Sequence, residues 1–375
     1  MNVKEDEFRN PNFVKMKILF LGETYRADAQ TWIQGIQKES SVTIVTDEIK
    51  TINNRFIRIL QSLLFIFRLL WGRYFGPKYD IVLAERSTSY GFFALFTNAK
   101  VKVVAQQGIS DIFPFTPISK FYKKILQHLV YTHVDLIHAW GHAMVPAMLK
   151  SGADPEKIMV LAKGLDLTRY TFVNQLAKKP LTLKAIVTRS LEKDYQHWNI
   201  IDAIAILNDK GIQLEVNLVG SGSLLEMLKA RAKEKNVAHL VKFLGRIPND
   251  ELPTLLTQCP LYLSVPTTEG VSSSLFEAMA SGCFPIVTDL PGNRAFINPK
   301  QNGDLVPIDN AEALANAIEK FLENPQQYEQ AILNNRKLID ETVNREKNIK
   351  VFWAKYQELC KYPIFRTGLD STFQF

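Results

Sequence analysis

The segment PTTEGVSSSLFEAMASGCFPIVTDLPGNR, residues 266–294, decides the fold of this chain. It follows Leu261–Val265, an apolar run with the length of a buried strand. Small hydroxyl residues at 272–274 then favour the start of a helix, and Gly282 suits the turn that ends one. A second apolar run, Phe284–Thr288, follows directly. Strand, helix and strand in this order predict a βαβ unit of a parallel sheet.

The same alternation of short apolar runs with helical patterns extends through both halves of the chain. Near-continuous apolar strands separated by helices are typical of parallel sheets that are buried on both faces. The predicted strands are Lys17–Leu21, Val42–Thr46, Asp80–Ala84, Val101–Ala105, Asp135–His138, Ile158–Ala162, Leu183–Thr188, Gln213–Val219, Val241–Leu244, Leu261–Val265 and Phe284–Thr288. We therefore expect an α/β fold of two Rossmann-like domains that face each other across a ligand-binding cleft.

The length of 375 residues suits two domains of ordinary size. We expect an acceptor-side domain over 1–170, a second domain over 171–342, and a C-terminal helix and tail, 343–375, that return to the first domain. The join falls near Gly164–Lys179, where the periodicity lapses.

The composition predicts a globular protein of a reducing compartment. Of its residues 46% are hydrophobic and 22% charged, and the three cysteines are spread singly, without a CxxC or a metal-ligand spacing. The charged N-terminus lacks the apolar core of a signal peptide, and Ile59–Phe67 is too short to span a bilayer. We expect a cytoplasmic protein, soluble or peripheral on the inner face of the membrane.

Two carboxylates frame the predicted helix within residues 266–294. A helix N-terminus with unpaired N–H groups binds phosphate readily, so residues Ser272, Ser273, Ser274 and Leu275 form a candidate phosphate site. Glu277 projects back toward the same end, where its carboxylate could accept two ribose hydroxyls, and Glu269 faces whatever is attached to the phosphates. A structural alternative is open for each: Ser274 and Glu277 have the spacing of a capping box, and Glu269 could be an exposed loop acid.

The wider pattern resembles the retaining glycosyltransferases of GT-B fold, family 4, also called glycosyl transferases group 1. Their hallmark, Glu-x7-Glu followed by Ala-Met-Ala-x-Gly, is matched by Glu269 to Gly282. Other blocks of the second half agree in order, namely Lys163-Gly-Leu-Asp166, Val219-Gly-Ser-Gly222, Phe243-Leu-Gly-Arg-Ile-Pro248 and Gln301-Asn-Gly-Asp-Leu-Val306. Over the first half the resemblance is only topological.

The resemblance implies a role for each matched residue. Glu277 would bind the ribose of a nucleotide, Glu269 would lie near the donor sugar, and Arg189 would neutralise the diphosphate leaving group, on which negative charge grows during the reaction. The remaining donor-binding candidates are Ser272, Ser273, Ser274, Leu275, Lys193, Gly220, Gly245, Arg246, Ile247 and Gly22. The chain has no Asp-x-Asp sequence, so no metal is expected to clamp the diphosphate. No cofactor is expected, and the implied substrate is a nucleoside diphosphate sugar, UDP in preference to GDP or ADP.

This sequence departs from the family pattern at two places. The family's lysine commonly follows the arginine by five or six residues, whereas Lys193 follows Arg189 by four, so Lys193 is either a donor ligand or a surface residue. Gln107 of Gln107-Gly108 stands where the family has a histidine. A glutamine can hydrogen-bond a sugar hydroxyl but cannot shuttle a proton.

The first half of the chain is basic, and its charge coincides with a long apolar helix. Between Lys50 and Lys124 the only acids are Asp80, Glu85 and Asp111, within a chain of net charge +7. One helical stripe predicts a core face: Leu60, Leu63, Leu64, Phe67, Leu70, Trp71 and Tyr74. The opposite side carries Arg55, Arg58, Phe65, Arg68, Leu69 and Arg73, which suits a helix lying on anionic lipid, with a second segment from Phe113 to Lys124. The alternative is a solvated face with Phe65 packed under a neighbouring loop. A nucleic-acid partner fits the charge but lacks a recognition motif.

The predicted function is transfer of a hexose-type unit from a nucleoside diphosphate sugar to a glycan or lipid-linked acceptor in cell-surface polysaccharide biosynthesis, with retention and without metal. Two rivals stay open on the same fold: a degenerate, non-catalytic nucleotide-sugar-binding protein, and a nucleotide-sugar epimerase. An epimerase would need a sugar-facing carboxylate in the first half, for which Glu85 is the candidate. A sugar phosphorylase would need a pyridoxal phosphate lysine and a longer chain.

Overall fold

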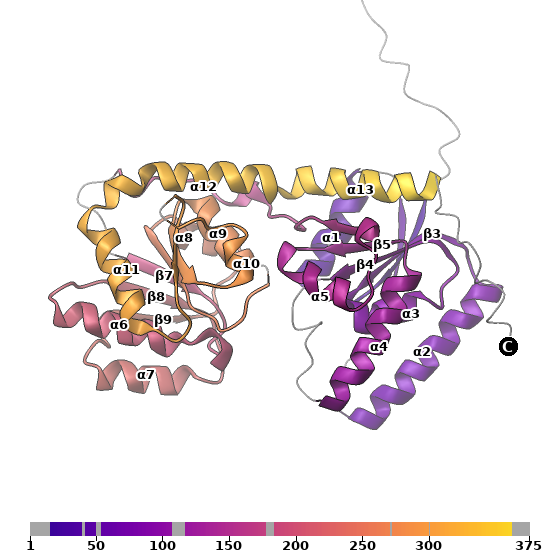
Figure 1. The fold of residues 1–375 in the computed structure, drawn as a ribbon, viewed down its shortest axis with the longest axis horizontal. Helices are drawn as coiled ribbons and strands as arrows, with labels where there is room; N and C mark the ends of the chain where they lie inside the picture. The colour runs from indigo at the N-terminus through magenta and orange to yellow at the C-terminus, as the bar shows by residue number, and fades with distance from the viewer. Residues whose placement is uncertain are drawn as a thin grey trace, which may run out of the picture. The chain divides into compact units, whose positions relative to one another are not determined.

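The computed structural model of the chain describes residues 16–39, 42–49, 54–106, 117–177, 184–270, 272–299 and 301–361. They form two compact α/β units, each built on one parallel six-stranded sheet (Figure 1). Unit 1 lies within Met1–Ala139, Pro146–Met159 and Ile349–Phe375, and unit 2 within Trp140–Val145 and Val160–Asn348.

Unit 1 has the strand order β2-β1-β3-β4-β5-β6. Its strands are β1 (Lys17–Leu21), β2 (Thr43–Asp47), β3 (Tyr79–Glu85), β4 (Ala99–Gln106), β5 (Leu136–Ala139) and β6 (Ile158–Val160). Its helices are α1 (Ala27–Glu39), α2 (Arg55–Phe75), α3 (Gly91–Ala94), α4 (Pro117–His133) and α5 (Val145–Lys150), with one π-helical turn over Arg86–Tyr90.

The last helix, α13 (Arg345–Lys361), contributes to the core of unit 1. Its Phe352 and Tyr356 are fully buried, and the Tyr356 hydroxyl lies 3.0 Å from Nδ1 of His138 in β5. Trp32 of α1 packs edge-on against the same histidine. Helices α1 and α13 therefore share one cluster of rings beside the sheet.

Unit 2 has the strand order β12-β11-β10-β7-β8-β9. Its strands are β7 (Lys184–Thr188), β8 (Glu215–Val219), β9 (Val241–Gly245), β10 (Leu261–Ser264), β11 (Phe284–Thr288) and β12 (Asp304–Val306). Its helices are α6 (His197–Asp209), α7 (Leu225–Glu234), α8 (Leu252–Leu256), α9 (Ser273–Ser281), α10 (Pro291–Arg294), α11 (Ala311–Glu323) and α12 (Glu329–Thr342).

Two apolar clusters lie on the two sides of the unit 2 sheet. One joins the sheet to α6, α7 and α11 through residues such as Ile204, Leu228 and Phe321, and the other joins it to α8, α9 and α12 through residues such as Leu256, Met279 and Ile339. The strand order is that of a dinucleotide-binding fold, and it reverses between β7 and β10. Ligands of such folds bind beyond the carboxyl ends of the strands at that reversal.

Every strand predicted from the sequence is present, with shifts of a few residues at the ends. β12 was not predicted as a strand because it has only three residues and begins with an aspartate. Apart from Trp140–Val145, the chain passes from unit 1 to unit 2 at Val160, earlier than the expected join, since Ala162 and Tyr170 pack into one of the apolar clusters of unit 2.

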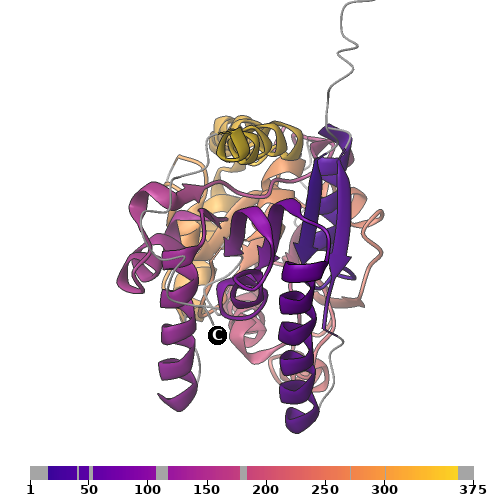
Figure 2. The ribbon, with the colours of Figure 1, turned by 90° about the vertical axis from the view of Figure 1, so that its right-hand side faces the viewer.

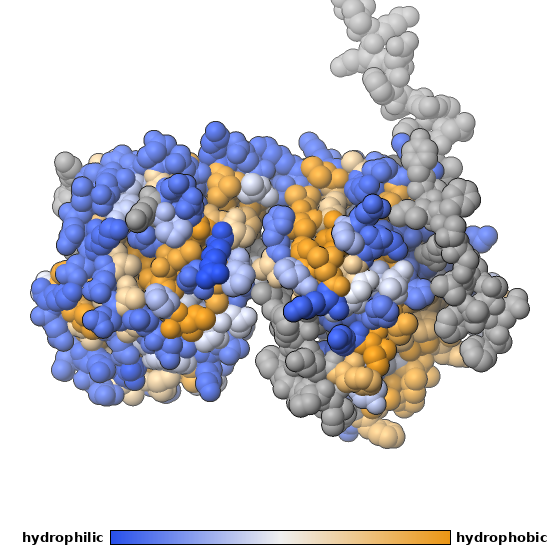
Figure 3. All heavy atoms as spheres, viewed as in Figure 1, coloured by the Kyte–Doolittle hydropathy of each residue, from blue (hydrophilic) through white to orange (hydrophobic). Residues whose placement is uncertain are grey.

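The predicted orientation of α2 is wrong. Phe65 and Leu69, expected on the exposed side, are only 4% and 7% exposed, and the Phe65 ring lies 5.1 Å from the ring of Phe93 in α3. The expected core stripe faces outward instead: Phe67 is 64% and Trp71 60% exposed. Figure 3 shows apolar residues gathered where α2 and α4 lie in Figure 1.

The reason lies in what α2 packs against. Its Phe65 contacts Tyr90 and Phe93, which belong to the π-helical turn and to α3, so the helix rests on a narrow ridge and buries a narrow stripe. Periodicity shows that an apolar stripe exists but not which of two stripes is covered.

Candidate functional site

The strand reversal of unit 2 brings together three of the predicted residues. Arg189 follows β7, Glu269 lies in the loop after β10, and Ser272 is the N-cap of α9. The Nη2 group of Arg189 donates to the Glu269 carboxylate and to the Ser272 hydroxyl. The Arg189 and Glu269 side chains are only 13% and 11% exposed, so this ion pair is largely shielded from water.

Arg189 is held in place by more than the ion pair. The Tyr195 ring lies 5.4 Å from its guanidinium carbon, a distance typical of a cation–π contact. Burial disfavours the charged form, but Tyr262 and Glu269 outweigh it and raise the pKa of Arg189. Its Nε group is buried and has no hydrogen-bond partner among the described residues. Arg189 is thus a cation held in a fixed position, with one buried donor that no described residue accepts.

The start of α9 differs from the predicted capping box. The N-cap is Ser272, whose hydroxyl accepts from the Leu275 N–H at 3.2 Å, whereas the Ser274 hydroxyl donates to the carbonyl of Thr188 at 3.0 Å. The capping-box alternative for Glu277 is therefore wrong, because with Ser272 as the N-cap the box position falls on Leu275, two residues before Glu277.

The capping of α9 by Ser272 also leaves fewer backbone amides for the predicted phosphate site. The Leu275 N–H is occupied by its cap. The amides of Ser273 and Ser274 have no hydrogen-bond partner within the part of the chain that the structure describes. The first turn of α9 therefore offers two adjacent donors rather than the whole run from Ser272 to Leu275.

Glu277 is a half-buried carboxylate with an unpredicted partner. Its carboxylate interacts with the hydroxyl of Tyr170. Burial raises the pKa of Glu277, against the opposing effects of Tyr170, Arg189, Arg169 and Lys163, and burial likewise raises the pKa of Tyr170. An acid kept here despite its desolvation cost is a functional candidate. Nothing in the spacing of Tyr170 in the sequence points to this contact.

Three glycines let backbone segments approach the Arg189 cluster. Gly220 has φ of 147°, and a Cβ there would lie 2.1 Å from the carbonyl oxygen of Arg189. Its N–H donates to the carbonyl of Gly245, which has φ of 68°, at 2.7 Å. A Cβ on Gly292 of α10 would lie 2.5 Å from the Glu269 carbonyl oxygen. Only glycine fits at Gly220 and Gly292 without moving the functional loops.

The remaining candidates of unit 2 lie at the edges of this site. Arg246 is exposed, and its Nε donates to the Ser221 hydroxyl at 2.9 Å, while Ile247 is half-buried. Lys193 is exposed in a single turn of 3-10 helix, and no contact of its side chain with Arg189 or Glu269 is present among the described residues. Its assignment as a donor ligand stays a prediction.

The unit 1 candidates form a separate cluster at the ends of β1 and β3. A Cβ on Gly22 would lie 2.7 Å from the Glu85 carboxylate, which accepts from the Glu23 N–H at 3.1 Å. The Glu23 carboxylate in turn accepts from Arg86 at 2.8 Å. Gly22 thus makes room for a side chain of its own unit. Gln107 lies outside the described residues.

His197, at the start of α6, is a site neighbour that the sequence did not reveal. It is 1% exposed, and neither ring nitrogen has a hydrogen-bond partner within the described ranges. Its ring packs edge-on against Tyr195, at 6.3 Å between centroids. Burial, together with the charge of Arg189, lowers the pKa of His197 to about 4. The histidine is therefore neutral above about pH 4.

This lowered pKa predicts a pH-dependent stability. The unfolded chain takes up a proton at His197 near pH 6.5, whereas the folded chain resists it until about pH 4. The stabilisation is complete above pH 6.5 and is lost as the pH falls toward 4, by about 3 kcal/mol. In His197→Phe this part of the loss should disappear, as measured by denaturant unfolding across that range. An unchanged pH dependence in the variant would contradict the buried neutral histidine.

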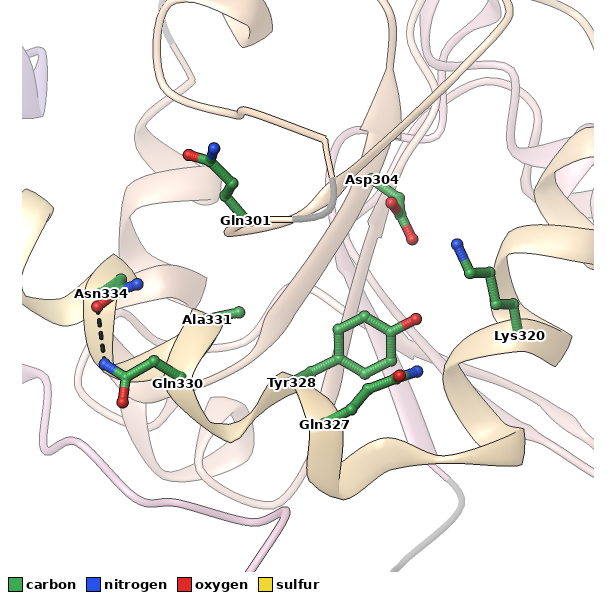
Figure 4. Close-up of a pocket in the computed structure, with 8 residues that line it drawn as sticks. All are labelled: Gln301, Asp304, Lys320, Gln327, Tyr328, Gln330, Ala331 and Asn334. Atoms are coloured by element: carbon green, nitrogen blue, oxygen red, sulfur yellow. Dashed lines mark hydrogen bonds between the residues drawn. The ribbon is translucent and has the colours of Figure 1, made fainter.

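One hollow of unit 2 lies apart from these residues. It has a volume of about 490 Å³ and is lined mainly by polar side chains from β12, the turn before it, α11, the 3-10 turn Pro325–Tyr328 and α12 (Figure 4). Tyr328 and Lys320 point into it beside Asp304, and none of the predicted donor-site residues lines it. The hollow is therefore not part of the Arg189 site.

Comparison with known proteins identifies the segment that holds the site. Residues 170–338 match the model of the family "Glycosyl transferases group 1". The chain is 29% identical over 228 residues to WcaL of Salmonella typhimurium, which is named as a glycosyltransferase of colanic acid biosynthesis; the match covers 57% of this chain and 55% of that one. The chain thus spans about half the length of this curated relative.

A second relative matches over more of its length. It is the N-acetylgalactosamine-N,N'-diacetylbacillosaminyl-diphospho-undecaprenol 4-alpha-N-acetylgalactosaminyltransferase of Campylobacter jejuni, 24% identical over 67% of this chain and 69% of the relative.

Solved structures share the fold over nearly the whole chain. The structure of Anabaena HepE with UDP and glucose has a TM-score of 0.71 at 17% identity, covering 92% of this chain and 100% of that one. Sucrose-phosphate synthase of Thermosynechococcus elongatus has a TM-score of 0.75 at 15% identity, covering 92% and 99%. With two units built on parallel sheets, this is the GT-B fold, and the segment 170–338, which carries Arg189, Glu269 and Glu277, matches the model of the glycosyl transferases of group 1.

Proposed function

We propose that the protein is a glycosyltransferase that moves a sugar from a nucleoside diphosphate sugar to a glycan or lipid-linked acceptor. The observation that carries this proposal is the cluster of Arg189, Glu269 and Ser272 at the strand reversal of unit 2. A cation, a carboxylate and the amino terminus of a helix meet there, in a segment that matches the family.

The chemistry follows from where charge develops. When the bond between the sugar and the diphosphate breaks, negative charge accumulates on the leaving oxygen. Arg189 is a buried cation whose Nε has no partner among the described residues, and the Ser273 and Ser274 amides point from the start of α9. We infer that these groups stabilise the diphosphate without a metal ion. Glu269, on the same guanidinium, would contact the sugar, and Glu277 the ribose.

The substrates are proposed by likeness to known proteins. HepE is described with UDP and glucose, which supports UDP as the nucleotide. The Campylobacter relative is named for a diphospho-undecaprenol acceptor, and WcaL for colanic acid biosynthesis, which supports a lipid-linked or polysaccharide acceptor. Retention of the anomeric configuration rests on the resemblance of Glu269 to Glu277 to the retaining family. The proposal includes a cytoplasmic site of action at the inner face of the membrane.

The two alternative functions, an epimerase and a degenerate binding protein, place different requirements on the site residues. An epimerase would need Glu85 to face a sugar, but Glu85 is 1% exposed and accepts the Glu23 N–H. A degenerate binding protein would need no fixed leaving-group cation, whereas Arg189 is held by Glu269, Ser272 and Tyr195. These observations favour the transferase.

The test combines binding with turnover. A UDP-sugar at about 100 times its Kd should stabilise the native protein by about 2.7 kcal/mol, measured as a rise in Tm. With an acceptor present it should yield a glycosylated product of retained configuration, determined by NMR, and EDTA should leave the rate nearly unchanged. Binding without transfer or donor hydrolysis would indicate the degenerate protein; a product with only an inverted sugar centre would indicate the epimerase. A metal requirement would contradict the role of Arg189.

A further inference from the structure

The side of α2 that unit 1 leaves uncovered carries large apolar side chains along the length of the helix. Among the α2 side chains that the structure describes, only Phe65 and Leu69 are buried. The exposed large side chains of this helix are Phe56, Ile57, Ile59, Leu60, Leu63, Leu64, Phe67, Trp71, Tyr74 and Phe75. A helix that is hydrophobic nearly all round is normally buried in a core or in lipid. Unit 1 covers only the narrow stripe of α2 that holds Phe65 and Leu69, so the exposed apolar side chains of this helix suggest a further binding partner.

Helix α4 adds a second exposed apolar stripe to the same unit. Phe121, Tyr122, Ile125 and Leu129 are exposed, while Val130 and Tyr131 are fully buried. Figures 1 and 2 show α2 and α4 projecting away from the sheet of unit 1 in the same direction. We call the exposed large apolar residues of both helices the α2–α4 surface. It holds most of the exposed large apolar side chains of the described residues, so these side chains are concentrated on two helices of one unit.

The charge of the two helices has one sign. Neither the sequence of α2 nor that of α4 contains an aspartate or a glutamate. Arg58, Arg73 and Lys124 are exposed beside the apolar residues. Arg68 is an exception to the predicted lipid face, since it pairs with Asp47 and lies over the Phe65 ring at 4.9 Å. The side chain of Arg55 and residues 113–115 lie outside the described part.

We propose that the α2–α4 surface docks unit 1 onto the surface of an anionic lipid bilayer. Exposed aromatic and aliphatic side chains would enter the interface, and the basic residues would meet the lipid phosphates. Within the described ranges no helix has the length and apolar character to cross a bilayer, so the contact is with the membrane surface. The inference rests on the proposed function in one respect, namely that a lipid-linked acceptor would lie in that bilayer.

The charge pattern favours lipid over a second copy of the chain. A two-fold dimer through these helices would place each copy's Arg58, Arg73 and Lys124 against an identical surface that supplies no acid. A bilayer containing anionic lipid supplies both the apolar interior and the opposite charge. Trp71, Tyr74 and Tyr122 are also residue types that favour the boundary between lipid and water.

The proposal is tested by sedimentation of the full chain with vesicles. Wild-type protein should pellet at low salt with vesicles of phosphatidylcholine and phosphatidylglycerol, stay in solution with phosphatidylcholine alone, and be released by added salt. The double variant Phe67→Asp, Trp71→Asp should bind anionic vesicles at least about tenfold more weakly. Leu333→Asp, which replaces an exposed leucine of α12 in unit 2, is the matched control and should bind like wild type. A UDP-sugar thermal shift verifies that each variant is folded.

Three results would overturn the inference: wild-type protein that ignores anionic vesicles at low salt, a double variant that binds them like wild type, or a dimer in solution that the double variant dissociates. None of these results bears on the proposed transferase activity, because nucleotide binding and transfer to a water-soluble acceptor are measured without vesicles. Conversely, a protein that binds vesicles but no nucleotide sugar would leave the membrane surface intact and remove the proposed reaction.

Discussion

Replacing Arg189 with alanine is expected to lower the rate of sugar transfer by about 100-fold while changing donor affinity much less. The side chain meets a charge that grows from the bound state to the transition state, so its loss should appear mainly in kcat. The measurement is steady-state kinetics with a UDP-sugar and a soluble acceptor, with donor binding followed separately by calorimetry.

Two further variants separate charge from structure. Arg189→Lys keeps the charge but loses the second donor and the stack on Tyr195, so it should recover only part of the rate. Arg294→Ala removes an exposed arginine whose partner is Asp289, and should leave kcat unchanged. Because Arg189→Ala leaves the Glu269 carboxylate buried without its partner, the unfolding curve of each variant must be recorded beside its rate. Full activity in a folded Arg189→Ala protein would place the leaving-group cation elsewhere, with Lys193 the first residue to examine.

The fold was predictable because its strands are short, apolar and separated by helices. Each predicted run, from Lys17–Leu21 to Phe284–Thr288, became a parallel strand, since a βαβ chain has few other ways to bury such runs. β12 was not predicted because a strand of three residues is too short to show an apolar pattern. The orientation of α2 was predicted wrongly for a different reason. The helix has two apolar stripes, and the ring contacts of Phe65 with Tyr90 and Phe93 determine which of them is buried.

The site was predictable only where its residues lie close together in sequence or follow a strand. Glu269, Ser272 and Glu277 lie in one loop and helix, and Arg189 follows β7, so the order of the strands brings it to Glu269 and Ser272. Tyr170 reaches Glu277 from outside any motif, and His197 gives no pattern that distinguishes it from a core residue. The N-cap at Ser272 shows the limit of local spacing, because Ser274 offered an equally good capping box.

The second large effect is expected at Glu277. Glu277→Gln should weaken UDP binding by about 1.5–3 kcal/mol, which corresponds to about 10- to 150-fold in Kd, because the carboxylate would accept charge-assisted hydrogen bonds from the ribose hydroxyls. Since Ser272 caps α9, the substitution removes no cap, and isothermal titration of the folded variant with UDP reports binding alone.

The stability of the ligand-free protein sharpens this prediction. Burial raises the pKa of Glu277, so the ionised carboxylate costs the fold free energy, and the neutral glutamine should leave the Tm unchanged or raise it. Tyr170→Phe is the matched control: it removes the hydroxyl that contacts Glu277 but keeps the ring packed, and should weaken UDP binding less than Glu277→Gln does. A purely structural Glu277 predicts the reverse pattern, a lower Tm with unchanged UDP affinity. Because binding and stability are expected to move in opposite directions, this pair of measurements decides whether the carboxylate is kept for its ligand or for its fold.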